Sequence, residues 1–403
     1  MSRITPSLRR LLPMVLGCLA LLVAGPTGAP TGLRAGVSDA GPDATLTLIL
    51  RDIDNNKLDV ALDRTNALLK AYPNFRLGWL IQGDLLLARA RPLTTFGNVP
   101  EGGDRLRDLR LEAIARLKGY RNRPADTQVP RYLLQMEADQ KYAVVVDTQR
   151  SRLYIYRNEN GRPVFVADYY ASQGKAGSNK MREGDNKTPL GVYHVTGFIP
   201  REKIGDFYGA GAFPINYPNE WDKREGKTGY GIWLHGVPSD TYARPPLASE
   251  GCVVISNQDF RAISGYMQAG RTPFIISDGV EWLSLDDWKS ERTSLNATIE
   301  QWRKDWESRD TARYLSHYSK EFKSGNQDFA AWSKQKQQVN AGKDFIEVDL
   351  RAMSMFRNPG KDMVVVAFEQ DYRSNNLSNV ARKRQYWVRE GSAWKIIYEG
   401  VAS

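Results

Sequence analysis

The sequence predicts a multidomain protein with three folded parts: a helical N-terminal region, a mainly-β domain and an α+β domain. Its 403 residues exceed what one hydrophobic core usually serves. The apolar spacing is helical from Ala44 to about Gln140, changes to strand patterns at Tyr142, and becomes a helix followed by long strands after residue 297. With 41% apolar and 25% charged residues, the chain is globular and not largely disordered.

An export signal is expected at the N-terminus. Arginines precede an apolar stretch from Leu11 to Ala24, and small residues follow it. This order is typical of a secretory signal peptide, here residues 1–24. A membrane anchor is the alternative, but the apolar run is short and is interrupted by proline and glycine. Lipidation at Cys18 is a second alternative, although the apolar run continues beyond it. We therefore expect an exported protein with a disordered lead-in over residues 25–43.

Residues 44–140 are predicted to form a helical accessory region. Apolar residues recur at helical spacing from Leu58 to Leu69, and Tyr72-Pro73 ends that helix. A second helix over 79–90 is expected to pack against the first, and a third covers 106–117. The pair resembles a tetratricopeptide-type hairpin, but no repeat period is present. Prolines 124 and 130 mark a loop, and the helices offer a surface for oligomerisation.

The middle of the chain, residues 141–278, is predicted to be a mainly-β domain. Residues 143–147 and 152–156 form two strands around a polar turn, and short strands then recur between Gly- and Pro-containing loops. One helix, over about 257–269, interrupts the strands. This pattern is typical of a small barrel or sandwich of short strands.

The C-terminal part is predicted to be an α+β domain after a polar linker over 279–296. A helical pattern runs from Leu295 to Phe322, and four alternating strands follow it. Trp302 and Trp306 are expected in the core of this domain, with a sugar-stacking platform as the alternative.

Two charged features of the C-terminal part also allow alternatives. His317 is expected to have a packing or surface role. The basic run Arg382-Lys383-Arg384 is interpreted as a solvated strand edge, or else as a contact for an anionic polymer. The net charge of +10 is spread along the chain without a recognition motif, so we predict no nucleic-acid partner.

The residues that can carry chemistry are few and converge in the middle domain. The sequence has two cysteines and three histidines, and once the leader is removed Cys252 is the only thiol. His235 ends an apolar strand, and Cys252 opens another strand after a Pro-rich loop. Neighbouring strands lie about 4.8 Å apart, so the imidazole and the thiol are expected to reach hydrogen-bond distance. Such a pair stores a thiolate against an imidazolium and makes a nucleophile. The alternative for Cys252 is a buried small hydrophobe.

Residues around this pair extend the motif. Gly251 allows the backbone to approach a substrate closely, and N–H groups near it, in the turn that begins at Ser249, are candidates for an oxyanion hole. The segment Lys187-Thr188-Pro189-Leu190-Gly191-Val192-Tyr193 is a turn that leads into a strand. His194, which follows it, is expected to be structural or site-lining. No group of residues has metal-ligand spacing, so we predict neither a metal nor a cofactor.

Together, TPxGxY, His-Gly and S-x-G-C resemble the L,D-transpeptidase (YkuD) catalytic domain in this order over residues 141–278. The resemblance implies that Cys252 is acylated by the meso-diaminopimelate carbonyl of a peptidoglycan tetrapeptide and that terminal D-Ala is released. It assigns His235 as general base and acid, and the carbonyl of Gly236 as the group that orients the imidazole. Many members have His and Arg where this chain has Glu250 and Val254, which leaves the pairing with a substrate carboxylate and the identity of the acyl acceptor open.

The segment over 297–403 resembles the nuclear transport factor 2-like fold. This combination of domains is similar to the cell-shape L,D-carboxypeptidase group, which implies a periplasmic enzyme of cell-wall remodelling. Resolution of the acyl-enzyme by an amine is transpeptidation, and resolution by water is L,D-carboxypeptidase trimming. The C-terminal domain is then expected to hold glycan, a stem peptide or an envelope protein. A catalytically idle peptidoglycan-binding scaffold is the alternative, which an intact His235/Cys252 pair disfavours.

Overall fold

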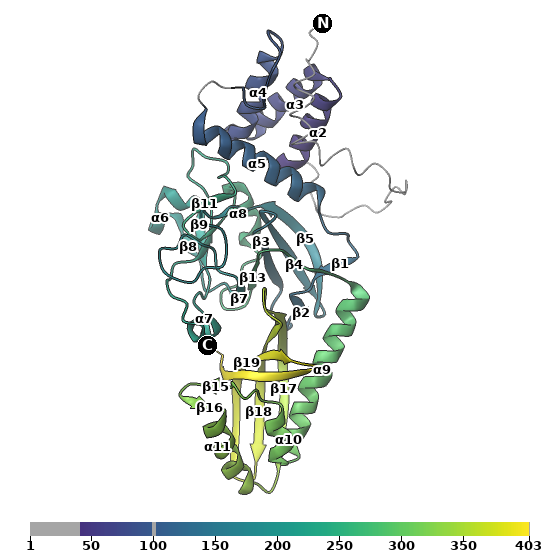
Figure 1. The fold of residues 1–403 in the computed structure, drawn as a ribbon, viewed down its shortest axis with the longest axis vertical. Coiled ribbons are helices and arrows are strands. Elements are labelled where there is room, and N and C mark those ends of the chain that lie inside the picture. The colour runs from purple at the N-terminus through teal and green to yellow at the C-terminus, as the bar shows by residue number, and fades with distance from the viewer. Residues whose placement is uncertain (1–40, 99–101, 403) are drawn as a thin grey trace.

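A computed structural model of the protein describes residues 41–98 and 102–402, so the predicted leader over 1–24 and Cys18 lie outside the described residues. The chain is elongated, with a helical region at one end, a β-rich domain in the middle and a sheet flanked by helices at the other end (Figure 1). Within the described residues, no helix is long and apolar enough to cross a membrane.

Among the described residues, the helical region contains four helices around a small core. They are α2 (Pro42–Asp54), α3 (Leu58–Ala71), α4 (Arg76–Leu87) and α5 (Gly103–Arg121). The predicted lead-in over 25–43 therefore ends too late, because α2 begins at Pro42, and proline is favoured in the first turn of a helix. The helical pattern also ends at Arg121 and not near Gln140.

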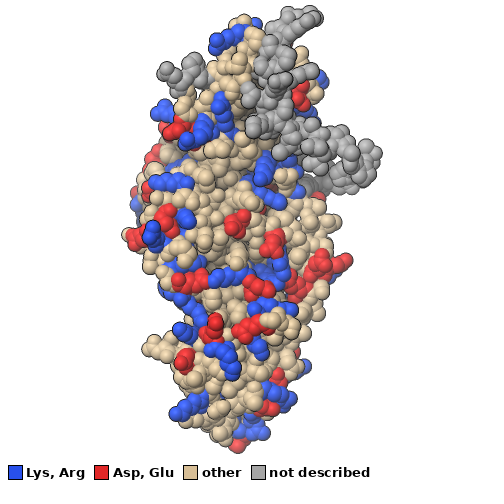
Figure 2. Space-filling view, in the orientation of Figure 1, with Lys and Arg blue, Asp and Glu red and all other residues tan. Residues whose placement is uncertain are grey.

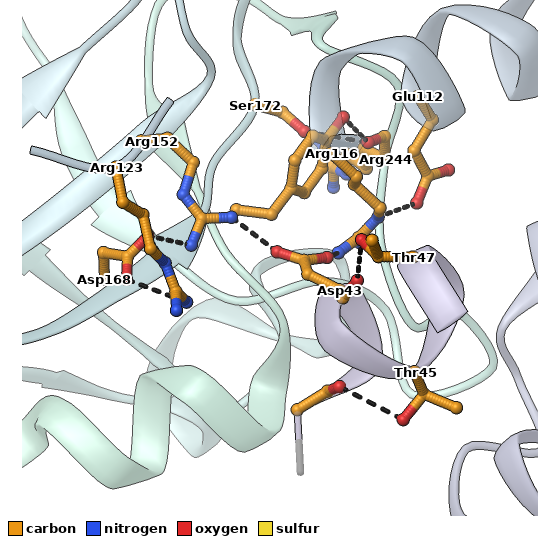
Figure 3. Close-up of polar contacts among 12 residues, drawn as sticks. Asp43, Thr45, Thr47, Glu112, Arg116, Arg123, Arg152, Asp168, Ser172 and Arg244 are labelled. Carbon is orange, nitrogen blue, oxygen red and sulfur yellow. Dashed lines mark hydrogen bonds and ion pairs between the residues drawn. The ribbon is translucent and has the colours of Figure 1, made fainter. Parts of the chain in front are cut away.

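Buried ion pairs join this region to the β-rich domain. Asp43 of α2 contacts Arg116 of α5, with 2.7 Å between Oδ1 and Nη1, and its other oxygen contacts Arg152 of the middle domain. Arg152 also contacts Asp168 (Figure 3). Burial by itself raises the pKa of Asp43, but the two guanidinium groups outweigh it and hold that pKa below its usual value. The charges are thus paired where they are withdrawn from water.

The segment between the helices and the β-rich domain differs from the prediction. A loop was expected around prolines 124 and 130, yet β1 (Gln128–Pro130) and β2 (Leu133–Gln135) form there. β1 pairs with β14 (Trp282–Ser284), and β2 pairs with β17 of the C-terminal sheet. Pro130 fits because β1 belongs to a two-stranded sheet, where proline can face away from the ladder.

The β-rich domain is built on two sheets. The first has the order β5-β4-β3-β13-β7, and the second has the order β12-β10-β9-β8. The bounds in the first sheet are β3 Tyr142–Asp147, β4 Arg152–Glu159, β5 Arg162–Tyr170, β7 Gly191–His194 and β13 Pro273–Ser277. Those in the second are β8 Ile199–Pro200, β9 Gly211–Pro214, β10 Trp233–His235 and β12 Val253–Val254. A third, two-stranded sheet pairs β6 (Gln173–Gly174) with β11 (Leu247–Ser249).

Short helices complete the β-rich domain, and one apolar core lies beneath its main sheets. The helices are α6 (Arg201–Ile204), η1 (Asp206–Tyr208), α7 (Glu220–Arg224) and α8 (Asn257–Ser264). Buried residues of both main sheets and of α8 share the core, among them Val144, Leu234, Val253 and Phe260. The core therefore fixes the strand ends of both sheets relative to each other.

The C-terminal domain is a curved sheet covered by helices. It contains α9 (Leu285–Glu307), α10 (Thr311–Ser316), α11 (Phe329–Ala341), β17 (Ile346–Arg357), β18 (Met363–Ser374), β19 (Leu377–Glu390) and β20 (Ala393–Val401), with a short β15–β16 hairpin (Lys323–Ser324 and Gln327–Asp328). The predicted linker over 279–296 is mostly strand β14 and the start of α9. Trp302 is fully buried and Trp306 nearly so, which makes both core residues and excludes the sugar platform.

The basic run in β19 is neither a solvated edge nor a free polymer contact. β19 lies inside the sheet, whose order is β2-β17-β18-β19-β20. Arg382 pairs with Glu137, just before the β-rich domain, at 2.8 Å, and Arg384 pairs with Glu220 of that domain at 2.7 Å. Elsewhere on the face drawn in Figure 2, basic and acidic side chains are interspersed and form no single-sign stripe.

Candidate active site

The two reactive side chains lie on adjacent strands, as predicted. β10 and β12 pair in parallel, with Leu234 opposite Val253, so His235 ends β10 and Cys252 directly precedes β12. Both side chains line one cleft of about 680 Å³ in the β-rich domain. The long connection between the strands, residues 236–251, forms part of the wall of this cleft.

The orientation of the imidazole follows from its neighbours. His235 is 2% exposed, and its Nδ1 lies 2.7 Å from the carbonyl oxygen of Gly236. A carbonyl oxygen only accepts, so Nδ1 carries the proton and Nε2 keeps its lone pair. The ring also meets the ring of Tyr208 edge-on at 5.1 Å between centroids. Burial lowers the pKa of His235 to about 4.

The thiol of Cys252 is partly exposed in the cleft, and its Sγ donates to the carbonyl oxygen of Gly231 at 3.4 Å. Desolvation raises the pKa of this thiol to about 11. The backbone N–H of Trp233 and the charge of Arg244 lower that pKa but do not outweigh the desolvation. The predicted hydrogen bond to His235 is not present among the described residues. Burial disfavours the charged form of both groups, which favours a neutral thiol and a neutral imidazole over the expected thiolate–imidazolium pair.

The turn before Cys252 is held by Ser249. The Ser249 hydroxyl donates to the carbonyl of Cys252 at 2.6 Å and accepts from the N–H of Gly251 at 3.1 Å. Ser249 is 3% exposed and shapes the turn. The φ angle of Gly251 is +129°, and a Cβ there would lie 2.7 Å from the carbonyl oxygen of Lys187. Only glycine fits this position.

The Lys187–Tyr193 segment packs against the turn that contains Gly251. Thr188 is fully buried, and its hydroxyl accepts from the N–H of Gly174 at 2.9 Å. Tyr193 is also buried, and its hydroxyl donates to the carbonyl of Leu190 at 3.1 Å. The TPxGxY motif thus positions the backbone beside Gly251.

Sequence reasoning missed two residues that line this cleft and one that lies behind it. Arg244 and Tyr208 line it together with Cys252. Asn257, the first residue of α8, accepts from the N–H of Ala210 and donates to the carbonyl of Val237, which fixes the chain that flanks the His-Gly step. No local pattern marks these residues, because each reaches the site from a different element.

The other two histidines lie elsewhere. His194 lines a separate cavity of about 350 Å³ between the β-rich and C-terminal domains, and burial lowers its pKa to about 4. His317 contacts Asp305, with 2.8 Å between Nε2 and Oδ2. Across residues 41–98 and 102–402, no group of three or more His, Cys, Asp or Glu side chains is arranged to hold a metal ion.

Comparison with known proteins identifies the family. A family model for the L,D-transpeptidase catalytic domain matches residues 141–276. The solved structure of Bdellovibrio bacteriovorus Bd1075 is 31% identical, with a TM-score of 0.61 over 68% of this chain and 98% of that one. The chain belongs to the L,D-transpeptidase (YkuD) family. No curated protein sequence matches it.

The C-terminal part of this L,D-transpeptidase-family protein is also identified. A model of the Cds6 C-terminal NTF2-like domain matches residues 294–400. The helical cell shape determining protein Pgp2 from Campylobacter jejuni, solved as a point mutant, is 25% identical, with a TM-score of 0.58 over 75% of this chain and 100% of that one. The prediction of a helical region, a YkuD domain and an NTF2-like domain is thereby confirmed.

Proposed function

We propose that this protein is an exported cysteine enzyme that cleaves the meso-diaminopimelate–D-Ala bond of peptidoglycan stem peptides. The observation that carries the proposal is the contact of His235 Nδ1 with the Gly236 carbonyl, in the same cleft as Cys252. This contact leaves Nε2 free to take a proton. The family membership supports the substrate class.

With a neutral Cys252 thiol and a neutral His235 imidazole, proton transfer accompanies the attack on the substrate and does not precede it. When the substrate carbonyl approaches, Cys252 gives its proton to Nε2 of His235 and Sγ attacks the carbonyl carbon. The C–N bond then breaks, the imidazolium returns the proton to the leaving amine, and a thioester remains. Water or a second amine attacks the thioester with His235 again taking the proton, and the thiol is restored.

Oxyanion stabilisation is assigned to the backbone at Cys252. The N–H of Gly251 already donates to Ser249, so it is engaged within the turn. The N–H of Cys252 has no acceptor among the described residues and lies beside the reacting sulfur. A donor fixed in this way stabilises the charge that develops on the carbonyl oxygen.

Mass spectrometry of purified muropeptides treated with the protein tests the activity. Loss of one alanine mass without dimers means L,D-carboxypeptidase trimming, and new dimers mean transpeptidation. Cys252→Ala is the control and is expected to remove both. A wild-type protein that binds but changes no muropeptide supports the alternative of an idle scaffold and contradicts the proposal.

We extend the proposal to cell shape and to location. Pgp2 is described as a helical cell shape determining protein, and the similarity supports a comparable role in the envelope for this chain. Export through the leader over 1–24 is tested by sequencing the N-terminus of the protein recovered from the periplasm. A start at Met1 would contradict cleavage.

The C-terminal domain is proposed to hold glycan, a stem peptide or an envelope protein near Cys252. A truncation near Asp278 would be a poor test, because it removes the partners of β1 and β2 and exposes Leu133 and Leu134, which are fully buried. Hydrogen exchange of the Cys252→Ala protein with purified sacculi is cleaner. Protection within 297–403 supports capture, and protection confined to the cleft contradicts it. Oligomerisation through the helical region stays a prediction.

A further inference from the structure

Arg244 lies in the cleft without an acidic partner. Its side chain lines the cleft together with Cys252 and His235. Nη2 donates to the carbonyl of Phe207 at 3.0 Å, and the guanidinium lies 4.5 Å from the centre of the Phe207 ring. No carboxylate among the described residues forms an ion pair with it. Most of its donors are therefore available to a ligand.

The backbone of Arg244 is fixed beside the strand that follows Cys252. Val254 of that strand is 1% exposed. Ser172 exchanges backbone hydrogen bonds with Val254 at 2.8 and 2.9 Å, and its hydroxyl donates to the carbonyl of Arg244 at 2.9 Å. The hydroxyl of Tyr170 donates to the same carbonyl at 2.9 Å. Two hydroxyl groups thus hold the main chain of Arg244 beside the strand that follows Cys252.

The helical region holds this loop from the other side. The ring of Tyr242 packs edge-on against both Tyr72 and Phe75, at 5.1 Å between centroids in each case. The N–H of Tyr242 donates to the carbonyl of Asn74 at 3.3 Å, and the Asn74 amide donates to the carbonyl of Ser239 at 3.0 Å. Contacts on both sides of Arg244 therefore restrict its position before any ligand arrives.

We propose that Arg244 binds the terminal carboxylate of the residue that leaves when Cys252 attacks. This inference rests on the proposed function and names the group that selects its substrate. A guanidinium can bind a carboxylate through two parallel N–H···O hydrogen bonds. In a peptide that ends in D-Ala, this carboxylate is attached to the same residue as the amine that leaves, so it is the anion closest to the scissile bond.

The guanidinium of Arg244 and the sulfur of Cys252 line the same cleft and influence each other's charge. The charge of Arg244 lowers the pKa of the Cys252 thiol, which desolvation raises. In return, Cys252 raises the pKa of Arg244, which burial lowers. An anion bound by Arg244 would therefore lie in the same cleft as the attacking sulfur.

A pair of substrates tests the assignment. Wild type and Arg244→Gln are assayed on a tetrapeptide ending in D-Ala and on the same peptide ending in D-alaninamide. We expect Arg244→Gln to lower kcat/KM by about 10- to 100-fold on the acid and by less than about 3-fold on the amide. Arg244→Lys keeps the charge but cannot form two parallel N–H bonds. Its kcat/KM on the acid should lie between those of wild type and Arg244→Gln. Equal losses on acid and amide would overturn the proposal.

Alkylation of Cys252 gives a readout that needs no peptidoglycan activity. The ratio of the rate with iodoacetate to the rate with iodoacetamide is expected to fall several-fold in Arg244→Gln, because only iodoacetate carries a carboxylate. The control is Lys175→Gln, a 53% exposed cation on the same cleft, which should leave the ratio unchanged. If no muropeptide is turned over, this ratio decides alone. A lower ratio in Arg244→Gln then supports the anion site even though the proposed function fails. An unchanged ratio overturns the proposal that Arg244 binds a carboxylate.

Discussion

The Nδ1 atom of His235 lies 2.7 Å from the carbonyl oxygen of Gly236, its neighbour in the chain. This contact assigns the ring tautomer without a carboxylate. A Cβ at residue 236 would lie 2.1 Å from Oδ1 of Asn257, so the backbone that supplies the carbonyl is packed too closely for a side chain. The base of the site is therefore oriented by main chain that is itself held by α8.

The resting charge state of the site can be measured through alkylation of Cys252. The pKa of the thiol is raised to about 11 and that of His235 is lowered to about 4. We expect the iodoacetamide rate to rise about tenfold per pH unit from pH 6 to near 10. His235→Gln should change this profile little. A rate that is flat from pH 5 upwards in wild type, and lost in His235→Gln, would mean a preformed ion pair.

Gly251→Ala is expected to remove activity and lower stability by about 3 kcal/mol, measured by denaturant unfolding. The backbone is at φ +129°, and the new methyl would meet the carbonyl of Lys187 at 2.7 Å. Gly184→Ala is the matched control. Gly184 has φ +75° with open space around it, so only the backbone conformation is penalised, by about 1 kcal/mol. Equal effects at both positions would contradict the close approach.

Asp43→Asn is expected to destabilise the protein by about 3 kcal/mol, because Arg116 and Arg152 lose a buried counter-charge. The pKa of Asp43 is lowered in the folded state, so its contribution is present above the unfolded value and is lost as pH falls through the folded one. The difference between wild type and variant should shrink below about pH 4. Asp59→Asn is the control. Asp59 is 86% exposed and pairs with Arg89, so its loss should change stability by less than about 0.5 kcal/mol.

Asn257→Ala is expected to lower kcat about tenfold and to change KM less than twofold. Its amide fixes Ala210 and Val237 on either side of the His-Gly step, and it does not line the cleft. Steady-state kinetics on a soluble muropeptide separates the two constants. A large rise in KM with unchanged kcat would instead mean that Asn257 acts on substrate binding.

The sequence predicted the elements that depend on local patterns. The periodicity of residues 142–159 fixes the β3–β4 hairpin, and two strand ends joined by a Pro-rich loop bring His235 and Cys252 into one cleft. The predicted thiolate–imidazolium pair stays a prediction, because burial, which no motif reports, disfavours both charged forms. Arg244 was missed for a similar reason, since its place in the cleft depends on contacts made by Ser172 and Tyr170.

Contacts between distant segments were also beyond the sequence patterns. Arg382 and Arg384 form a basic run when the sequence is inspected alone, but each has its acidic partner far away in the sequence. Asp43 was placed in a lead-in because of the Gly- and Pro-rich composition around it, whereas its partners Arg116 and Arg152 lie far along the chain. Composition cannot distinguish such a residue from a solvated one.

Strand β2 has a consequence for the order in which the protein is completed. It is an edge strand of the C-terminal sheet, and the Gln135 amide bonds the carbonyl of Met353 across a sequence separation of 218 residues. The whole YkuD domain is thus inserted between one strand of that sheet and the other four. During synthesis, β2 and its buried leucines are complete long before their partner strand β17 is made, and closing so long a loop is slow. The nascent chain therefore keeps an open sheet edge until its C-terminal strands arrive, which makes this edge a natural site for chaperone capture or aggregation.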